Sequence, residues 1–447
     1  MRMKRICGPV LAGILLLLCL PAQGAAGGDS ALQSFADTVE AHAWNLDTAF
    51  SVPCDWTLRS ELKKTSSVGD ETSQLSEIMT RAGCYAYSVA YTGSGVRIEG
   101  AAYYPGWIIL RRYETGKTGL LTPREQQTLE QALALAGSAK GTDLEKERYI
   151  FDALCARITY ETTDAPPAGE EQTDEKDSAV GALLNGRADC DGYSDAMVLC
   201  CGLAGVPCRY IHGESTVSLR RGAGDTTHMW NLVYVGGSWL MCDATWGDQD
   251  RADPCYLYFN IGRRNASLSY HWNTGTQFPD IASMADFSTQ LMPDQQPVPA
   301  YSMTEVYLAA RAAATEGKRR LILYCPEEAF WQSDRETFRR MLHHGGLCAY
   351  SFQDSGALFE ITEITLPEAP FRFCDSEEEI PGAVEEYAEA GTNTFCLYFP
   401  PALSEILLAN ECARLKEVLS GSRIRGADRF LYSDDSGSVT LEGVSFF

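Results

Sequence analysis

Two short runs rich in apolar and aromatic residues predict a β-hairpin near the middle of the chain. They span residues 228–235 and 238–243, and only Gly236 and Gly237 separate them. Two glycines between such runs favour a two-residue turn, because both turn positions then adopt a positive φ without strain. The pattern therefore predicts two antiparallel strands joined by a tight turn.

The length of this turn sets which residues of the hairpin face each other. It places Asp243 opposite Trp230 and Thr245 opposite His228. Because side chains alternate along a strand, these four residues are expected on one face of the sheet. His228 and Asp243 are then diagonal neighbours on the two strands. Their backbone positions are about 7 Å apart, which is within side-chain reach. A shift of one residue in the register would separate them.

An apolar-periodic stretch at 194–204 predicts a helix just upstream, which ends at the Gly-Val-Pro of 205–207. Cys190 precedes this helix. A cysteine at a helix start meets unpaired N–H groups and the positive end of the helix dipole, which favour the nucleophilic thiolate. Gly192 permits a close approach of a substrate backbone, and the same N–H groups could hold an oxyanion. Acidic neighbours on both sides distinguish Cys190 from a buried structural cysteine.

Each candidate also has a non-catalytic interpretation. His228 could be a surface histidine at a strand start, and Asp243 a turn or helix-cap residue. Their joint placement favours catalysis over both. His212 also follows a predicted strand, but no acid lies opposite it in a comparable hairpin, and Asp195 is expected to be solvated or to cap the helix. The tryptophans around the hairpin are expected in the core, although one could line a substrate channel: Trp230, Trp239 and Trp246.

The order of helices and strands recurs along the chain. Residues 301–374 and 375–447 each predict helix, strand, helix, strand, strand, with a Gly- and Asp-rich turn before the last strand. Residues 30–105 fit the same plan. We therefore expect three α-β-α-β-β modules of about 75 residues. Chance similarity between small α+β domains is the alternative.

The domain plan follows from these patterns and from the length of 447 residues, which is too long for one small core. We expect a signal peptide at 1–24 and an N-terminal α+β module at 28–112. A catalytic domain is expected at 118–290, and α+β modules at 301–374 and 375–447.

The first residues are typical of an export signal. Basic side chains occur within the first five positions, an apolar stretch extends to Leu20, and small residues follow. We expect cleavage near Gly24–Ala26 and a secreted or cell-surface protein, with an uncleaved anchor as the alternative. No later stretch is long and apolar enough to cross a bilayer.

Charge and cysteine content narrow the choice of partner. The net charge of −23 argues against nucleic acid and anionic lipid, and leaves a preference for basic peptide segments open. The 16 cysteines form no dense framework, so we expect no more than about two disulfides. The chain holds neither a CxxC nor an HExxH motif, and we expect no metal ion and no cofactor.

Three segments resemble the cysteine, histidine and aspartate motifs of the transglutaminase-like superfamily: 186–196, 228–231 and 239–246. Residues 205–208 (Gly-Val-Pro-Cys) look like the start of a strand in that family, and the resemblance covers roughly 145–250. It implies a papain-like α+β core, in which a helix carrying the cysteine packs on an antiparallel sheet.

The resemblance also implies roles: Cys190 as nucleophile, His228 as base and Asp243 as the residue that orients the imidazole. The chain departs from the common pattern at Asp189, where a small or apolar residue is usual. An acid there would oppose thiolate formation. No set of acidic residues matches the calcium sites of animal cross-linking members.

We therefore expect an exported thiol enzyme that forms an acyl-enzyme on the amide bonds of a protein or peptide, including cell-wall peptide. The N–H of Cys190 and one upstream donor would hold the oxyanion. Hydrolysis is favoured, because water needs no second binding site, whereas attack by a lysine amine would make the protein a cross-linking transglutaminase. A non-catalytic surface or scaffold protein is the other class.

Overall fold

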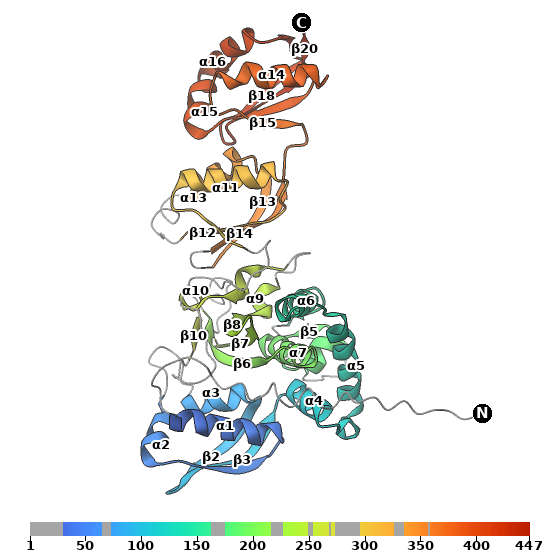
Figure 1. Cartoon of the computed structure of the whole chain (residues 1–447), viewed down its shortest axis with the longest axis vertical. Helices are drawn as coiled ribbons and strands as arrows, with labels where there is room; N and C mark the ends of the chain where they lie inside the picture. The colour runs from blue at the N-terminus through green and yellow to red at the C-terminus, as the bar shows by residue number, and fades with distance from the viewer. Residues whose placement is uncertain are drawn as a thin grey trace, which may run out of the picture.

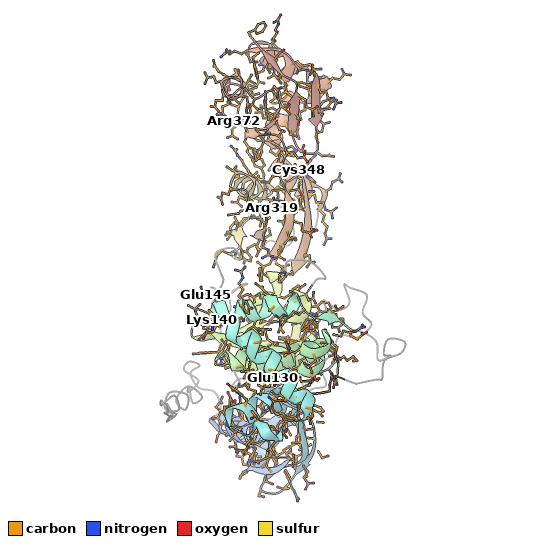
Figure 2. All side chains as sticks on the ribbon, turned by 90° about the vertical axis from the view of Figure 1, so that its right-hand side faces the viewer. Glu130, Lys140, Glu145, Arg319, Cys348 and Arg372 are labelled. Atoms are coloured by element: carbon orange, nitrogen blue, oxygen red, sulfur yellow. The ribbon has the colours of Figure 1, made fainter. Side chains whose placement is uncertain are left out.

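The computed structural model describes residues 30–64, 73–161, 175–215, 227–248, 254–267, 270–272, 296–325, 335–355 and 358–447. The signal peptide predicted at 1–24 and its cleavage site near Gly24–Ala26 lie outside these residues. Four units follow one another along the long axis of the molecule (Figure 1). The same order is visible after a turn of 90° (Figure 2), so the molecule is elongated rather than spherical.

The N-terminal unit has helices on one face of a three-stranded antiparallel sheet with the strand order β1-β3-β2. Val52 and Ile98 point from this sheet into the core under the helices, because alternate residues of a strand face opposite sides. Its elements are α1 (Ser30–Trp44), β1 (Ala49–Pro53), α2 (Trp56–Leu62), α3 (Gln74–Arg81), β2 (Cys84–Tyr91) and β3 (Gly95–Tyr103).

The central unit packs helices against a five-stranded antiparallel sheet with the order β10-β6-β7-β8-β9, and α7 makes most of this contact. Its helical elements are α4 (Pro105–Glu114), η1 (Thr118–Leu120), α5 (Pro123–Ser138), α6 (Asp143–Cys155), η2 (Gly181–Asn185), α7 (Cys190–Leu203), α9 (Ala244–Gly247), η3 (Tyr256–Tyr258) and α10 (Arg263–Ala266). Its strands are β4 (Thr159–Tyr160), β5 (Arg187–Ala188), β6 (Cys208–Ser215), β7 (Thr227–Val235), β8 (Ser238–Cys242), β9 (Phe259–Ile261) and β10 (Tyr270–Trp272).

Helix α7, which begins at the candidate nucleophile, lies directly on this sheet. The amide nitrogen of Asn231 on β7 donates to the backbone oxygen of Ser194 on α7, at 3.1 Å. The predicted fold class, α+β with a cysteine-bearing helix on an antiparallel sheet and flanking α+β modules, is confirmed.

The two C-terminal units share one topology. Their sheets have the orders β11-β12-β14-β13 and β15-β16-β19-β18, and in each the first pair is parallel and the others antiparallel. The first unit contains β11 (Val298–Pro299), α11 (Met303–Thr315), β12 (Leu321–Tyr324), α13 (Arg335–His344), β13 (Ala349–Ser355) and β14 (Leu358–Thr365). The second contains β15 (Phe371–Phe373), α14 (Glu379–Glu389), β16 (Phe395–Tyr398), α15 (Pro401–Leu407), α16 (Ala409–Ser420), β17 (Ile424–Gly426), β18 (Arg429–Ser433), β19 (Ser438–Glu442) and β20 (Ser445–Phe446).

The N-terminal order β1-β3-β2 is the same plan without its first strand. The short parallel strands β11 and β15 were not predicted, and the second of the two helices expected in 375–447 is two helices, α15 and α16. The cause of that break is local, since Asn410, Glu411 and Cys412 have positive φ.

One continuous hydrophobic core joins the N-terminal and central units, from Leu32 to Tyr270, and each C-terminal unit has its own core. The predicted boundary between 28–112 and 118–290 thus falls within a shared core, and the domain boundaries themselves stay a prediction.

The hairpin has the predicted register. Val235 pairs with Ser238, and the ladder continues to Asn231 opposite Cys242. There β8 ends and helix α9 begins, so Thr245 lies in a helix. The strand pattern had placed Thr245 opposite His228, and that prediction is wrong.

Candidate active site

Asp189 is the N-cap of helix α7 and occupies the helix start. Its Oδ1 accepts the N–H of Asp191 at 3.1 Å and that of Gly192 at 3.3 Å. Its Oδ2 accepts Lys176 Nζ at 2.8 Å. Side-chain oxygens of this kind satisfy the donors that a helix start leaves unpaired. The unusual acid beside the cysteine therefore has a structural role in the helix.

Cys190 is held as a thiol in this geometry. Burial raises the pKa of Cys190 well above its ordinary value, and the negative charges of Asp191 and Asp189 raise it further. The sulfhydryl donates to Asp191 Oδ1 at 3.5 Å. The predicted activation by the helix start is wrong for this state, because Asp189 already uses the N–H groups that would have stabilised a thiolate.

The N–H of Cys190 itself makes no hydrogen bond within the described part of the chain. It is the one donor of the predicted oxyanion site that the cap leaves available, since the next two are bonded to Asp189. A backbone N–H of this kind can donate a hydrogen bond to the negatively charged oxygen of a tetrahedral intermediate.

Asp191 connects the thiol to the N-terminal unit. Tyr104, the residue before helix α4, donates its hydroxyl to Asp191 Oδ2 at 3.3 Å. Burial raises the pKa of Asp191, with a further contribution from Asp189, while the charge of His212 lowers it. His212 thus lies in the neighbourhood of the site, although the hairpin pattern gave no reason to place it there.

His228 and Asp243 form a buried pair. His228 Nε2 lies 2.7 Å from Asp243 Oδ2, and the two side chains are 3% and 0% exposed. The other carboxylate oxygen, Oδ1, accepts the N–H of Trp246 at 3.1 Å and caps helix α9. The catalytic and the capping interpretations of Asp243 are therefore compatible, because each uses a different oxygen.

Aromatic rings surround the His228 imidazole. Trp246 lies 5.5 Å from it between ring centroids, Trp230 5.7 Å and Tyr270 6.3 Å. Trp230 is buried, as expected of a core aromatic. The rings exclude water from the pair, which strengthens its electrostatic interaction.

Tyr270 is a site residue that the sequence did not reveal. Its hydroxyl donates to Asp243 Oδ2 at 2.9 Å. Burial raises the pKa of Tyr270 well above its ordinary value, so the hydroxyl keeps its proton and remains a donor. The residue lies on the three-residue strand β10, whose pairing with β6 has no local signal in the sequence.

The backbone of Met229 links the two halves of the site. It lowers the pKa of the Cys190 thiol, which places it near the sulfur. Met229 follows His228 directly, so the chain that carries the imidazole passes near the sulfur. No hydrogen bond joins Cys190 to the His228 ring itself among the described residues.

Tyr160 marks the accessible side of the thiol. The residue is 43% exposed, and after burial the largest influence that raises its pKa is the charge of Cys190. Its ring lies 6.5 Å from that of Tyr193, a buried residue of helix α7. An exposed aromatic beside a half-buried thiol is suited to contact a substrate.

Asp195 is neither solvated nor a cap, contrary to the sequence-based expectation. It is fully buried, and its Oδ2 accepts the N–H groups of Gly106 and Ala179, both at 2.8 Å. Its Oδ1 accepts the hydroxyl of Tyr210 at 2.8 Å. Burial raises the pKa of Asp195 to about 6. This carboxyl ties helix α7 to helix α4, a long-range contact that periodicity cannot reveal.

The cysteines and the acids near the thiol give no separate metal centre. All fourteen cysteines in the described ranges are thiols. Asp189, Cys190 and Asp191 come together closely enough to resemble a ligand set, but the helix start, Lys176 and Tyr104 already engage the carboxylates.

Residues 131–244 match the family model of the transglutaminase-like superfamily, and the chain therefore contains a domain of that superfamily. Among curated proteins, kyphoscoliosis peptidase of Homo sapiens is 34% identical over 110 residues, which cover 24% of this chain and 16% of that protein. The Mus musculus protein of the same name is 32% identical over 110 residues, with the same coverage. The match thus spans about one sixth of the length of these relatives.

Two solved structures are more distant. One, proposed to be a cysteine protease from Cytophaga hutchinsonii, is 21% identical, with a TM-score of 0.21, over 27% of this chain and 37% of that one. The other, a TGase, is 13% identical, with a TM-score of 0.24, over 47% of this chain and 53% of that one. Within the described residues no helix has the length and apolar character needed to span a membrane.

Proposed function

We propose that the transglutaminase-like domain is a thiol enzyme that hydrolyses peptide amide bonds, with Cys190 as nucleophile, His228 as base and Asp243 as the residue that orients the base. The observation that carries this proposal is the buried His228–Asp243 pair, in which Nε2 lies 2.7 Å from Oδ2. The backbone of Met229, the residue after His228, lowers the pKa of the Cys190 thiol, which places the pair in the neighbourhood of the sulfur. The similarity to kyphoscoliosis peptidase supports the same class of reaction.

The bond between His228 and Asp243 supports a different role for each nitrogen of the imidazole. Nε2 of His228 is engaged by Asp243, which leaves Nδ1 for the thiol. In the reaction Nδ1 takes the proton of Cys190 as the sulfur attacks the substrate carbonyl carbon, and the N–H of Cys190 donates to the new oxyanion. The leaving amine takes the proton from His228, and a thioester remains.

Water completes the cycle. His228 removes a proton from a water molecule, the resulting hydroxide attacks the thioester carbon, and the collapse of the intermediate releases a carboxylic acid and the Cys190 thiol. A primary amine in place of water would yield a new amide bond and would make the protein a cross-linking enzyme.

Activation requires the thiol to leave Asp191. In the resting geometry the sulfhydryl donates to that carboxylate, and burial and the neighbouring acids keep it protonated. A substrate that displaces this hydrogen bond would bring the proton to His228 only in the complex. We propose Tyr160 as a substrate contact at this position, because its exposed ring lies beside the sulfur.

The test is an incubation of the purified chain with casein and with purified cell wall, each with and without a fluorescent primary amine. Release of new amino groups that is lost in Cys190→Ala and in His228→Ala supports hydrolysis. Incorporation of the amine identifies acyl transfer instead. The protein is a non-catalytic scaffold if neither occurs and if a thiol-directed electrophile labels Cys190 no faster in the wild type than in His228→Ala.

We also propose that the protein is exported, on the basis of the basic start, the apolar stretch and the small residues near Gly24–Ala26. Expression of the full chain in a bacterial host, followed by N-terminal sequencing of the exported protein, tests this. A mature N-terminus close to Ala26 is expected, whereas retention of Met1 in the cell would contradict it.

A further inference from the structure

Each C-terminal unit turns the helix-free face of its sheet toward the unit before it (Figure 1). In the unit of β12 and β14 that face is covered by protein. Ile322 and Leu358 join the core of the central unit, and Glu360 Oε1 accepts the N–H of Tyr256 at 3.2 Å. This face of the sheet is therefore an interface within the chain.

The last unit has a corresponding face with a different composition. The pair Cys396–Thr440 occupies the same place in the last sheet as the pair Ile322–Glu360 in the sheet before it. By the same rule, Ser438 is equivalent to Leu358. The apolar Ile322 and Leu358 of the first face are thus replaced by the thiol of Cys396 and the hydroxyl of Ser438, so the second face is less apolar, although both side chains are buried.

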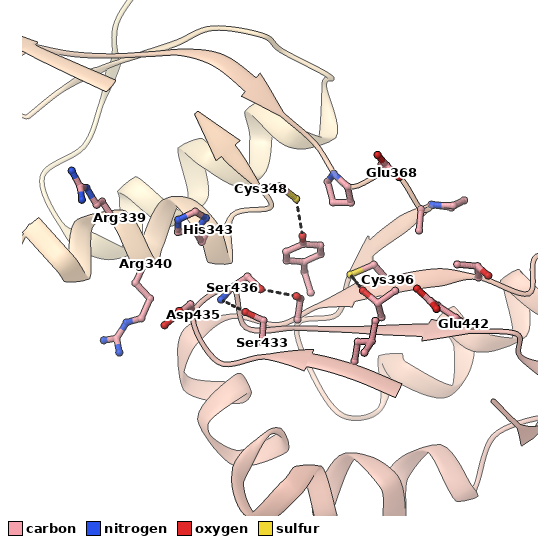
Figure 3. A pocket seen from close by; sticks show the side chains of 18 of the residues that line it. Arg339, Arg340, His343, Cys348, Glu368, Cys396, Ser433, Asp435, Ser436 and Glu442 are labelled. Carbon is pink, nitrogen blue, oxygen red and sulfur yellow. Dashed lines mark hydrogen bonds between the residues drawn. The ribbon is translucent and has the colours of Figure 1, made fainter. Parts of the chain in front are cut away.

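This second face is the floor of a cleft of about 1040 Å³, and helix α13 of the preceding unit forms a wall (Figure 3). Polar contacts hold the floor in place. Thr440 Oγ1 donates to Cys396 Sγ at 3.4 Å, and the Tyr398 hydroxyl lies 3.6 Å from Cys348 Sγ of the preceding unit. The two units therefore build the cleft together, with a volume that matches known ligand sites.

The basic side chains of the cleft lie together at one end. Arg339, Arg340 and His343 of helix α13 lie at one end and Glu368 and Glu442 at the other (Figure 3). Within the described ranges neither guanidinium has an ion-pair or hydrogen-bond partner. Six of the eleven arginines of the two C-terminal units have an acidic partner, so what distinguishes Arg339 and Arg340 is their position side by side in the cleft.

Asp435 lies beside Arg340 at the same end of the cleft (Figure 3), and Glu336 precedes both arginines on helix α13, so the total charge of the lining is negative. A simple polyanion would be repelled by the acidic end. The arrangement fits a ligand whose own charges are separated in the opposite sense, with carboxylates for the arginine pair and a cation for the glutamate end.

We propose that this cleft binds an extended peptide segment with acidic residues at one end and a basic residue at the other. The guanidinium groups take the peptide carboxylates in planar, bidentate contacts, and the floor hydroxyls take its backbone amides. Leu431, which is 50% exposed on the cleft wall, offers an apolar contact. A polysaccharide is disfavoured because Tyr398, the aromatic residue of the lining, is only 3% exposed and its ring face cannot stack on a sugar.

The experiment measures fluorescence anisotropy of three labelled, capped peptides on the full chain. The mixed-charge peptide has the sequence Glu-Glu-Ser-Gly-Ser-Lys. A second peptide has Gln in place of both Glu residues, and a third has Lys in their place. The mixed-charge peptide is expected to bind, and the other two are expected to bind about tenfold more weakly or worse.

The matched variants are Arg339→Gln with Arg340→Gln, and Arg425→Gln as control. Arg425 is an exposed arginine on β17, outside the cleft. The double variant should lose about tenfold in affinity for the mixed-charge peptide and little for the Gln peptide, while the control changes neither. All the substituted side chains are exposed, so folding should be unaffected.

The proposal is overturned if the double variant binds the mixed-charge peptide like the wild type, or if no peptide binds at 1 mM (about the weakest specific affinity). It is also overturned if polygalacturonate binds in place of the peptides. Cys190→Ala should leave the peptide affinity unchanged, so this result stands or falls separately from the proposed hydrolase activity.

Discussion

Tyr270 donates its hydroxyl to Asp243 Oδ2 at 2.9 Å, the same oxygen that lies 2.7 Å from His228 Nε2. Oδ2 of Asp243 therefore interacts with both the Tyr270 hydroxyl and the His228 imidazole, while Oδ1 caps helix α9. Because the hydroxyl cannot move away from a fully buried position, it fixes the direction from which Asp243 approaches the imidazole.

Replacement of Tyr270 by Phe tests this positioning role. The variant loses one hydrogen bond to a charged acceptor, so kcat should fall about tenfold, with little change in KM, since Tyr270 is buried away from the substrate. Peptide hydrolysis as a function of substrate concentration gives both constants. An increase in KM at constant kcat would show that Tyr270 contributes to binding instead.

The two oxygens of Asp243 separate catalysis from stability. Asp243→Asn keeps an oxygen for the N–H of Trp246 but removes the charge that faces His228. We expect it to lower kcat by about a thousandfold or more and to unfold at nearly the wild-type temperature. Asp243→Ala loses the cap as well and should also lose about 1 kcal/mol of stability.

Thermal unfolding of both variants, beside their peptide hydrolysis rates, provides the comparison. The charge argument fails if Asp243→Asn remains as active as the wild type. The capping argument fails if the Asn and Ala variants unfold at the same temperature, because only the Ala variant leaves the N–H of Trp246 unpaired.

Asp191 should control the reactivity of the thiol. Its charge is the largest influence after burial among those that raise the pKa of Cys190, and its Oδ1 accepts the sulfhydryl. Asp191→Asn removes a negative charge beside the sulfur, which favours the thiolate, so the pKa of Cys190 should fall. Alkylation of Cys190 by iodoacetamide should then begin at lower pH than in the wild type.

Peptide-level mass spectrometry distinguishes Cys190 from the other thiols in this experiment. Cys348, an exposed cysteine far along the chain, is the internal control, and its rate should not change in Asp191→Asn. Identical pH profiles for Cys190 in the two proteins would rule out this role of Asp191. Tyr104→Phe should shift the profile less, since it removes only a neutral donor from Asp191.

The hairpin shows what local patterns could predict. Two glycines set the register from Val235 to Cys242, and that register brought His228 and Asp243 to one face. The helix that follows Cys190 and the flanking α+β modules also follow from periodicity, whereas the packing of that helix on an antiparallel sheet was implied by the family resemblance. These features depend on residues close in sequence, where turn chemistry and side-chain alternation decide the outcome.

The remaining contacts of the site join residues far apart in sequence, so local patterns could not predict them. Tyr270 reaches Asp243 through a three-residue strand, and Tyr104 reaches Asp191 from another unit. From the sequence, Asp189 was expected to oppose thiolate formation because of its negative charge. Its role as a helix cap was missed because the helix was predicted to begin at residue 194, whereas it begins at Cys190. Oδ1 of Asp189 therefore takes the N–H groups of Asp191 and Gly192.

Asp195 should give the protein a distinct dependence of stability on pH. Burial raises its pKa to about 6, whereas an aspartate in the unfolded chain has a pKa of about 3.9. Between these values the folded state binds the proton more tightly than the unfolded state. Its contribution to stability is therefore full below about pH 4, falls as the pH rises to about 6, and is constant above that.

Asp195→Asn cannot titrate and should lack this decline. From pH 4 to pH 7, the difference in unfolding free energy between wild type and variant should change by on the order of 3 kcal/mol, in favour of the variant at the higher pH. Urea unfolding followed by tryptophan fluorescence measures it. Asp37→Asn, at an exposed position of α1, is the matched control and should show a much smaller change. A wild type that instead gains stability relative to Asp195→Asn as the pH rises would mean that the donors from Gly106, Ala179 and Tyr210 outweigh burial and keep the carboxylate charged.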